Sequence, residues 1–417
     1  MLINFTVGNY RSFKDAVTLS LEATAMKEHK ESIIENGKYK LLPSVVIYGA
    51  NSSGKSNLLM AFSKMKDILL SSVQLNPGDK LSYDPFALVK SNDKKPVYFE
   101  IEFFIGNVKY KYGYTYTSKV IVSEWLYETR MKEREYQLFY RLDKDIRISK
   151  TRYKEGNGKE ESTTNNRLFL SLVAQLNGKI SQSILEWFKH SYYVSGLNSN
   201  DYLASSIEML HRQKPGSKEA LTFFNQLNLG FDNITFEKNK FKNNDLLSLF
   251  SYNILNKIGE KPFSMKTIHK LYDESGNIIG HKEFDEMKME SEGTKKIIEM
   301  SGPIFKVLLN GSILFIDELD AKLHPILTRQ IILLFNNSET NKKGAQLIFV
   351  THDTNLLNNK IFRRDQIWFT EKNEMESTDL YSLVEFKDVK GKKIRNDSNL
   401  EKNYINGRYG AIPYIKE

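Results

Sequence analysis

The sequence contains no cysteine in its 417 residues, which excludes both disulfide bonds and thiolate metal sites. It also has no apolar run near the about 20 residues that a membrane-spanning helix needs. The first residues, MLINFTVGNYRSFKD, carry charges early and have no apolar core, so they do not form a signal peptide. His, Asp and Glu show no zinc-type cluster. We therefore expect a cytoplasmic protein without membrane contact.

Positive charge is in excess, since 60 Lys and Arg residues face 51 Asp and Glu residues and give a formal net charge of +9. Such an excess permits contact with nucleic acid. Because the basic residues are interleaved with acidic ones, a well-solvated basic surface explains the charge equally well. Both interpretations stay open on composition alone.

Residues 49–56 read GANSSGKS and match the P-loop pattern G-x-x-x-x-G-K-S/T. Gly49 and Gly54 lack a Cβ atom, so the backbone can turn tightly and bring its N–H groups close to phosphate oxygens. Lys55 would place its ammonium between the β- and γ-phosphates, and the Ser56 hydroxyl would meet Mg²⁺. The predicted cofactors are thus ATP and Mg²⁺, with ATP held by Gly49, Asn51, Ser52, Ser53, Gly54, Lys55, Ser56 and Asn57.

The surroundings of this loop match the motif. Residues 44–48 form a largely β-branched run that is typical of a buried strand. After the loop, Leu58, Phe62, Met65 and Leu69 recur at helical spacing and predict a helix that faces the core. Strand, glycine loop and helix is the arrangement that the motif requires, so a chance match in a glycine turn is the weaker interpretation.

A second strand is predicted in SILFIDELDAKLHP at 312–325, and it ends in Asp317 and Glu318. We expect this strand to lie beside the P-loop strand, where Asp317 can hold Mg²⁺. Glu318 can then orient and deprotonate the attacking water as the catalytic base. Taken alone, the stretch also suits a strand that ends in a solvated acidic turn. The presence of the P-loop favours the catalytic interpretation.

Two further stretches carry polar groups at the ends of predicted elements. QLIFVTHD at 346–353 is an apolar strand that leads to His352, which we expect to hydrogen-bond the γ-phosphate and sense its loss; a structural role is the alternative. In ESEGTKKII at 290–298, Ser291 and Gly293 precede a predicted helix at 294–309 and offer donors at its positive end. One chain with two phosphate-binding elements suggests that two copies clamp ATP between them. The predicted catalytic residues are Glu318, His352 and Lys55.

The order of these elements indicates an α/β fold in three parts. Residues 1–130 form the N-terminal half of the ATPase domain, with antiparallel strands at 2–7, 97–103 and 109–116 beside the P-loop strand. Residues 131–285 form an insertion for partner or dimer contacts, mainly helical, with a hairpin around 273–277. Residues 286–417 form the C-terminal half. A long insertion between the P-loop and Asp317, with a serine-glycine signature before the latter, is typical of ABC-type ATPases.

The sequence resembles the compact ABC-type ATPases related to SMC and RecF proteins, namely the overcoming-lysogenisation-defect and RloA-type ATPases. The resemblance covers nearly the whole chain, and its marks are NYRSFK at 9–14, GANSSGKS, Pro85-Phe86, EWLY at 124–127, SEGT at 291–294, FIDELDAKLHP at 315–325, THD at 351–353 and NGRYGAIP at 406–413. It implies an ATPase head with a mixed central sheet and a flanking antiparallel β lobe. It also implies that Ser291 and Gly293 act in trans on the partner's nucleotide, and that 321–324 is the D-loop, with His324 in place of the usual aspartate.

Members of the wider group often belong to bacterial anti-phage systems. Those of the overcoming-lysogenisation-defect type carry a C-terminal Toprim nuclease, whose acidic pattern we do not find after His352. The resemblance therefore implies an ATPase subunit, a homodimer or higher oligomer, that controls a separate effector such as a nuclease or toxin. The alternative is a RecF-like DNA-binding ATPase in repair or recombination, which the basic stretch 387–393 favours. A scaffold that binds ATP without hydrolysis is disfavoured by the acid pair Asp317 and Glu318.

Overall fold

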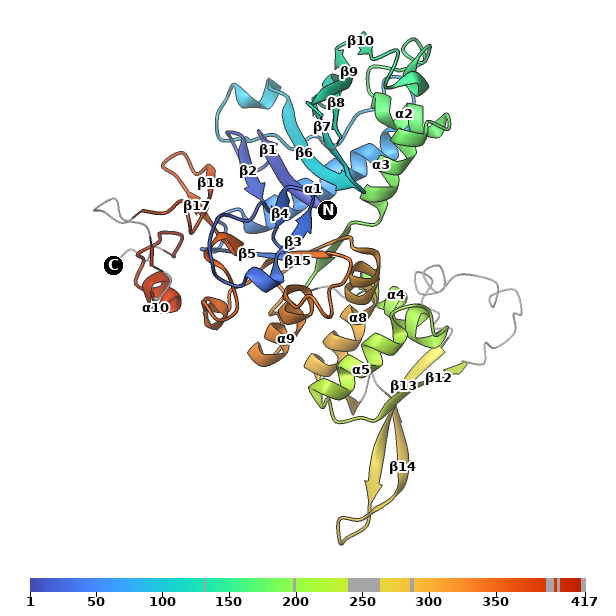
Figure 1. The fold of residues 1–417 in the computed structure, drawn as a ribbon, viewed down its shortest axis with the longest axis vertical. Helices are drawn as coiled ribbons and strands as arrows, with labels where there is room; N and C mark the ends of the chain where they lie inside the picture. The colour runs from blue at the N-terminus through green and yellow to red at the C-terminus, as the bar shows by residue number, and fades with distance from the viewer. Residues whose placement is uncertain are drawn as a thin grey trace.

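The computed structural model describes residues 1–130, 133–197, 200–238, 263–285, 289–387, 394–395 and 398–413. Its centre is a six-stranded sheet of order β11-β15-β16-β5-β17-β18 (Figure 1). The first five strands are parallel, and β18 pairs with β17 in the antiparallel direction. The strands of this sheet are β5 (Ser44–Gly49), β11 (Tyr192–Ser195), β15 (Ile313–Asp317), β16 (Gln346–Val350), β17 (Ile367–Lys372) and β18 (Thr378–Ser382).

A second sheet of seven antiparallel strands has the order β10-β9-β8-β7-β6-β1-β2 and forms a lobe above the central sheet in Figure 1. Its strands are β1 (Leu2–Gly8), β2 (Val17–Ser20), β6 (Val97–Ile105), β7 (Val108–Tyr116), β8 (Ile121–Thr129), β9 (Tyr136–Leu142) and β10 (Asp145–Ile148). The alternating pattern of β6, in which every second side chain is buried, suits a sheet with one face on the core. A two-stranded ribbon, β3 (Ile34–Asn36) with β4 (Tyr39–Leu41), lies close by.

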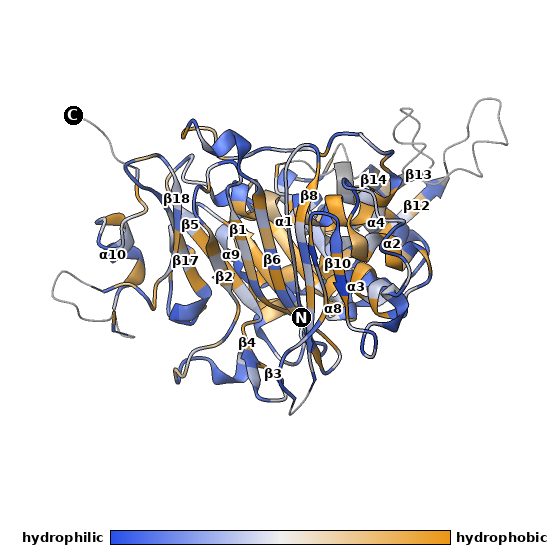
Figure 2. Ribbon diagram, turned by 90° about the horizontal axis from the view of Figure 1, so that it is seen from above, coloured by the Kyte–Doolittle hydropathy of each residue, from blue (hydrophilic) through white to orange (hydrophobic). Residues whose placement is uncertain are grey.

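Successive residues of β5 belong to different cores, because both faces of the central sheet are covered. Val45 and Ile47 pack in the cluster that contains the antiparallel lobe, whereas Val46 and Tyr48 pack in the cluster on the opposite face. All six residues of β5 are buried. A parallel strand covered on both sides needs such a continuous apolar run, which explains the 44–48 pattern. Figure 2 shows the same arrangement, with apolar segments gathered inside and polar ones outside.

Helices fill the space on both faces of the central sheet. On the lobe side α1 (Lys55–Ser71) lies between the two sheets, and Leu58, Phe62, Met65 and Leu69 are all buried there as predicted. On the other face the long helix α8 and its neighbour α9 cover β15 and β16. The helices beyond α1 are α2 (Phe169–Gln175), α3 (Lys179–Lys189), α4 (Asn200–His211), α5 (Ser217–Leu227), α8 (Glu292–Asn310), α9 (Pro325–Asn336) and α10 (Leu400–Ile405).

Short 3₁₀ turns join many of these elements, namely η1 (Lys30–Ser32), η2 (Ser72–Gln74), η3 (Asn92–Lys94), η4 (Lys154–Gly156), η6 (Thr354–Leu356) and η7 (Arg364–Gln366). Among the described helices none is long and apolar enough to cross a membrane.

A three-stranded sheet, β12 (Asn233–Lys238), β13 (Phe263–Tyr272) and β14 (Ile278–Asp285), stands apart from the two large sheets. The hairpin β13–β14 projects from the body as a long arm in Figure 1. Its loop lies at 273–277, so the hairpin prediction is confirmed. Four large apolar side chains at its tip are exposed between 40% and 62%, namely Leu271, Tyr272, Ile278 and Ile279. We call these four residues the arm tip.

The predicted fold class is confirmed, since the chain combines a mixed central sheet with a separate antiparallel lobe. Two details of the prediction are wrong. The antiparallel strands at 2–7, 97–103 and 109–116 do not pair with the P-loop strand but form their own sheet, with α1 between. The strand that ends in Asp317 is not beside β5, because β16 lies between them.

The strand β11 was not predicted at all, because its four residues sit in a stretch with a helical pattern. Within the predicted insertion, β9 and β10 complete the antiparallel lobe, and β11 forms an edge of the central sheet. The domain division at 130 and 285 stays a prediction.

A buried glutamine ties the two large sheets together. The Gln346 side chain, at the start of β16, accepts a hydrogen bond from the Leu2 N–H at 2.6 Å. Its amide donates to the carbonyls of Leu2 at 3.0 Å and Leu42 at 3.2 Å. All three partners are buried main-chain groups that cannot bond to water, so Gln346 satisfies their hydrogen bonds. Through Leu2 it also joins β16 of the central sheet to β1 of the antiparallel lobe.

We predict that Gln346→Leu lowers the free energy of unfolding by about 1–3 kcal/mol, because three buried main-chain groups lose their partner. Urea unfolding followed by circular dichroism measures the change. Gln137→Leu on the exposed side of β9 is the matched control and should stay within about 0.5 kcal/mol of the parent. Equal unfolding midpoints for the two variants would contradict the role of Gln346.

Candidate nucleotide-binding site

The loop between β5 and α1 adopts the tight turn that its glycines permit. Gly54, the residue before the helix, has a φ of 107°. A Cβ atom at this position would lie 2.2 Å from the Thr378 hydroxyl oxygen, and one at Gly49 would lie 2.5 Å from the carbonyl oxygen of Thr370. Both positions therefore require glycine, one for its conformation and both for space.

Strands β17 and β18 and the N-terminal segment hold this loop from outside. The hydroxyls of Ser53 and Thr370 are 2.6 Å apart, and Thr378 Oγ1 donates to the Ser53 carbonyl at 2.8 Å. On the helix, Asn57 Nδ2 donates to Ser12 Oγ at 2.9 Å. The NYRSF segment thus lies directly against the first turn of α1, although it is far from it in sequence.

Lys55 reaches back over the loop that precedes it. Its Nζ donates to the carbonyls of Gly49 at 2.8 Å and Ala50 at 2.9 Å. Burial lowers the pKa of Lys55, and the negative charges of Asp317, Glu318 and Asp320 oppose this shift. The ammonium is therefore a pre-positioned cation at the centre of the loop.

The two distant halves of the predicted site meet at one hydrogen bond. Ser56 Oγ donates to Asp317 Oδ1 at 3.0 Å. Burial raises the pKa of Asp317, while the bond from Ser56 and the charge of Lys55 lower it. The carboxyl end of β15 and the start of α1 therefore converge on one point.

A hydroxyl and a carboxylate at this distance fit a magnesium ion, which prefers oxygen ligands. Within the described residues no group of three or more His, Cys, Asp or Glu residues could hold a metal by itself. This agrees with Mg²⁺ that arrives with a nucleotide and takes only one or two ligands from the protein. Ser56 and Asp317 would be those ligands.

Glu318 follows directly and is half-buried, with a φ of 56° that is unusual for a residue with a side chain. We call residues 317–320 the acid turn. The main-chain N–H of His352 lies 3.4 Å from both carboxylate oxygens of Asp320. The structure therefore brings together Lys55, Asp317, Glu318 and His352, all of which were chosen from the sequence.

Ser291 and Gly293 lie at the N-terminus of α8 and not at the P-loop. Ser291 caps α8, and its Oγ accepts from the Thr294 N–H at 3.1 Å, as the predicted helix start requires. A Cβ on Gly293 would lie 3.3 Å from the carbonyl oxygen of Lys322, and the ammonium of Lys322 is 3.0 Å from the Glu292 carboxylate. Among the described residues no hydrogen bond joins Ser291 or Gly293 to 49–57.

The predicted D-loop 321–324 therefore lies next to the serine-glycine segment of the same chain. His324 caps α9, with its Nδ1 accepting from the Ile326 N–H at 3.3 Å. These contacts are local, and the roles assigned to Ser291, Gly293 and His324 stay predictions.

Sequence reasoning missed several residues around the site. Arg11, with a φ of 48°, reaches Asn57 Oδ1 at 3.5 Å, and only the NYRSF mark pointed to it. At the far end of the chain, the Tyr404 ring lies 5.6 Å from that of Tyr48 and 5.5 Å from that of Phe369. The C-terminal segment thus packs beneath the P-loop strand. The basic stretch 387–393 lies outside the described residues, apart from Lys387.

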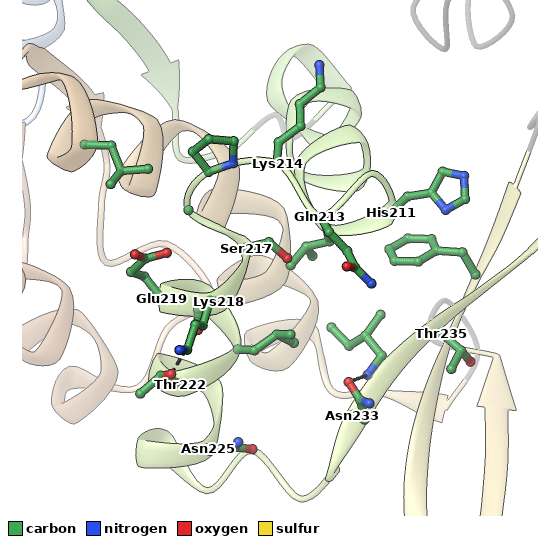
Figure 3. A pocket seen from close by; sticks show the side chains of 17 residues that line it. His211, Gln213, Lys214, Ser217, Lys218, Glu219, Thr222, Asn225, Asn233 and Thr235 are labelled. Atoms are coloured by element: carbon green, nitrogen blue, oxygen red, sulfur yellow. Dashed lines mark hydrogen bonds between the residues drawn. The ribbon is translucent and has the colours of Figure 1, made fainter.

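The cavity in Figure 3 is separate from the predicted nucleotide site. It measures about 920 Å³ and lies between the α4–α5 turn and β12, where Lys214, Ser217 and Thr235 are among its lining residues. None of its lining residues belongs to the P-loop, the acid turn or the segment that contains His352. The predicted nucleotide site is therefore not this cavity.

Residues 44–358 match the family described as "AAA domain, putative AbiEii toxin, Type IV TA system". The chain belongs to this family. The matched range contains the P-loop, Ser291, the acid turn and His352, and membership implies that the chain binds a nucleotide. A comparison with curated proteins gives no match.

Several solved structures are similar to this chain at low identity. The SmcHead bound to the C-winged helix domain of ScpA is 13% identical, covers 91% of this chain and 97% of its own, and has a TM-score of 0.39. The recombination mediator protein RecF, as RecF-ATPrS, is 12% identical, with coverage of 91% and 98% and a TM-score of 0.30. RecF-ATP is 13% identical, with coverage of 91% and 97% and a TM-score of 0.28.

We predict that Gly54→Ala lowers nucleotide affinity at least about 100-fold, because the new methyl group displaces Thr378 and distorts the loop. Titration with a fluorescent ATP analogue measures the affinity. Gly78→Ala is the control, since Gly78 also has a positive φ but no atom within 4 Å of the added Cβ. It should lose some stability and keep its affinity. Equal affinities in both variants would contradict the prediction.

Proposed function

We propose that this chain is an ATP-hydrolysing switch, in which two copies enclose two Mg-ATP molecules and hydrolysis reshapes the pair. The observation that carries the proposal is the hydrogen bond from Ser56 to Asp317, which joins the P-loop to the acid turn. A P-loop alone binds phosphate, but a carboxylate and a second acid beside it give the means to hold a metal and activate water.

Each residue of the site has its own role in ATP binding or hydrolysis in this proposal. Backbone N–H groups of 49–56 and the ammonium of Lys55 grip the phosphates. Ser56 and Asp317 would hold a magnesium ion, whose charge would neutralise that of the phosphates. Glu318, one residue beyond Asp317, takes the proton from the attacking water. His352, whose main chain lies beside Asp320, hydrogen-bonds the γ-phosphate.

The second copy completes the site in this proposal. Ser291 caps the 19-residue helix α8, whose N-terminus offers N–H groups and the positive end of the helix dipole. Since Ser291 and Gly293 have no bond to the P-loop of their own chain, we assign them to the nucleotide held by the other chain. Closure of the homodimer would then require ATP at both sites.

We further propose that the chain controls a separate effector protein, a nuclease or toxin, in an anti-phage system. The family description names a toxin and a toxin–antitoxin system, which supports such a partner. The arm tip is the surface that we assign to it, because its four neighbouring apolar side chains stand on a projecting hairpin and are exposed among the residues that the structure describes.

A polar contact connects the arm to the start of α8, which we assign to the nucleotide of the second copy. Glu290 directly precedes Ser291, and its carboxylate accepts from Thr267 Oγ1 at 2.6 Å. The imidazole of His269 lies 2.8 Å from the same oxygen. Thr267 and His269 both belong to β13, so a shift of the helix cap would move the base of the arm.

Glu318→Gln should abolish ATP turnover while nucleotide affinity stays unchanged, because the amide cannot accept the proton. The variant should also accumulate as a dimer with ATP, since the closed state can no longer be resolved by hydrolysis. Phosphate release and sedimentation velocity measure the two effects. Glu339→Gln, an exposed acid after α9, is the control and should behave like the parent. Normal turnover in Glu318→Gln would overturn the assignment of the base.

Ile279→Asp at the arm tip should weaken effector binding at least about 30-fold, because a charge would replace an apolar contact that the bound effector buries. Basal ATP turnover should stay unchanged. Purification of the neighbouring gene product with the tagged chain, followed by calorimetric titration, measures this. Lys282→Asp on the same strand tests whether charge alone matters. Equal binding by the parent and Ile279→Asp would remove the arm tip from the interface.

A further inference from the structure

Gly196 lies where three elements meet beneath the acid turn. It directly follows β11, and its N–H donates to the Asp317 carbonyl at 2.6 Å. A Cβ atom at Gly196 would lie 1.9 Å from the carbonyl oxygen of Glu318 and 2.6 Å from that of Asp317. The main chain of the acid turn therefore rests on a residue that has no side chain, and any larger residue would displace it.

The backbone of Glu318 needs this support. Its φ of 56° falls in the left-handed region, which residues with a Cβ atom rarely adopt. An unfavourable conformation persists where the surrounding contacts enforce it. Here the Gly196 N–H bonds the carbonyl of Asp317, and the Glu318 carbonyl lies where a Cβ atom of residue 196 would be. The direction of the Glu318 side chain thus depends on where Gly196 is held.

A buried lysine holds Gly196 from the other side. Lys296 is only 3% exposed, and its Nζ donates to the Gly196 carbonyl. The pKa of Lys296 is lowered to about 8, chiefly by burial, and the charges of Glu299, Glu318 and Asp320 oppose this shift. Lysine is almost never fully buried unless it is paired, so a lysine retained here has a specific contact to make. Its neighbour Lys295 instead pairs with Glu292 at 3.1 Å.

The position of Lys296 near the start of α8 links its contact with Gly196 to the helix cap. It lies five residues after Ser291, the helix cap that we assign to the nucleotide of the second copy. A displacement of the start of α8 therefore moves the Lys296 ammonium and, through Gly196, the backbone of Glu318. Within one chain, a path of contacts therefore runs from α8, whose cap we assign to the nucleotide of the second copy, through Lys296 and Gly196 to the acid turn that contains Glu318.

We propose that Lys296 is a positioning residue for hydrolysis, which acts through Gly196 to set the orientation of Glu318 when α8 engages the ATP of the second copy. This inference rests on the proposed function, in which Glu318 is the base and Ser291 acts in trans. It adds a specific link between the two ATP sites, and α8 makes this link. The start of α8 meets the nucleotide of the other copy, and Lys296 of the same helix acts on Glu318 of its own chain.

The test compares Lys296→Met, which keeps the length of the side chain without its charge, with Lys295→Met as the matched control. We expect Lys296→Met to lower kcat at least tenfold, with the KM for ATP, the affinity for a fluorescent ATP analogue and ATP-dependent dimerisation all within twofold of the parent. Lys295→Met should leave all four unchanged. Lys296→Arg, which restores a buried cationic donor, should recover most of the lost kcat. Thermal unfolding of each variant is measured on the same preparations.

A second variant approaches the contact from the opposite side. Gly196→Ala should also lower kcat, and the double variant with Lys296→Met should be no slower than the slower single one, because both changes break one path. Multiplied effects in the double variant would overturn the proposal. So would an unchanged kcat in Lys296→Met, or a joint loss of stability and nucleotide affinity, which would assign the lysine to folding.

Failure of the proposed function gives a different result. A parent protein without ATP turnover would overturn both ideas, and full turnover in Glu318→Gln would remove the base that Lys296 is said to position. ATP turnover in the parent and loss of turnover in Glu318→Gln, together with full turnover in Lys296→Met, would overturn the inference alone.

Discussion

The hydrogen bond between Ser56 and Asp317 joins two segments that lie far apart in the chain, and the fold is arranged to make it. Parallel strands place their carboxyl ends on one edge of a sheet, and ligand sites form there because side chains from several strands meet. In this chain β5 ends at the P-loop, β15 at Asp317 and β16 just before Thr351 and His352. With β16 between the other two strands, His352 enters the site from the middle.

This convergence demands a central sheet that is buried on both faces. The strand residues alternate between two cores, one shared with the antiparallel lobe and one with α8 and α9. Buried backbone polar groups must be paired, so the parallel ladder and side chains such as Gln346 have to satisfy every one of them. Such a sheet resists deformation, so our proposal assigns the motion to elements outside the sheet, above all α8 and the arm.

The P-loop, the acid turn and His352 were predictable because each is a local pattern: an apolar run, then polar groups at the strand end. Strand order was harder, because the sequence contains no information on which strand inserts between two others, and β15 was wrongly expected beside β5 for that reason. β11 was missed since four residues are too few for a period to be seen. Gly196 and Lys296 are recognisable only from three-dimensional contacts, because nothing near them in sequence explains their position, and for Arg11 the sequence offered only the NYRSF mark.

The polar contacts around α8 are the reason why we assign control of hydrolysis to this helix and not to the P-loop. Its first residues are tied to the arm through Glu290 and to the segment after the acid turn through the Glu292–Lys322 pair. One turn further, Lys296 reaches Gly196 and hence the base. By contrast, the P-loop is fixed by β17, β18 and the N-terminal segment and has little room to shift. In our proposal the nucleotide is held by this rigid part, whereas its hydrolysis depends on α8, the helix that we assign to the contact with a second copy.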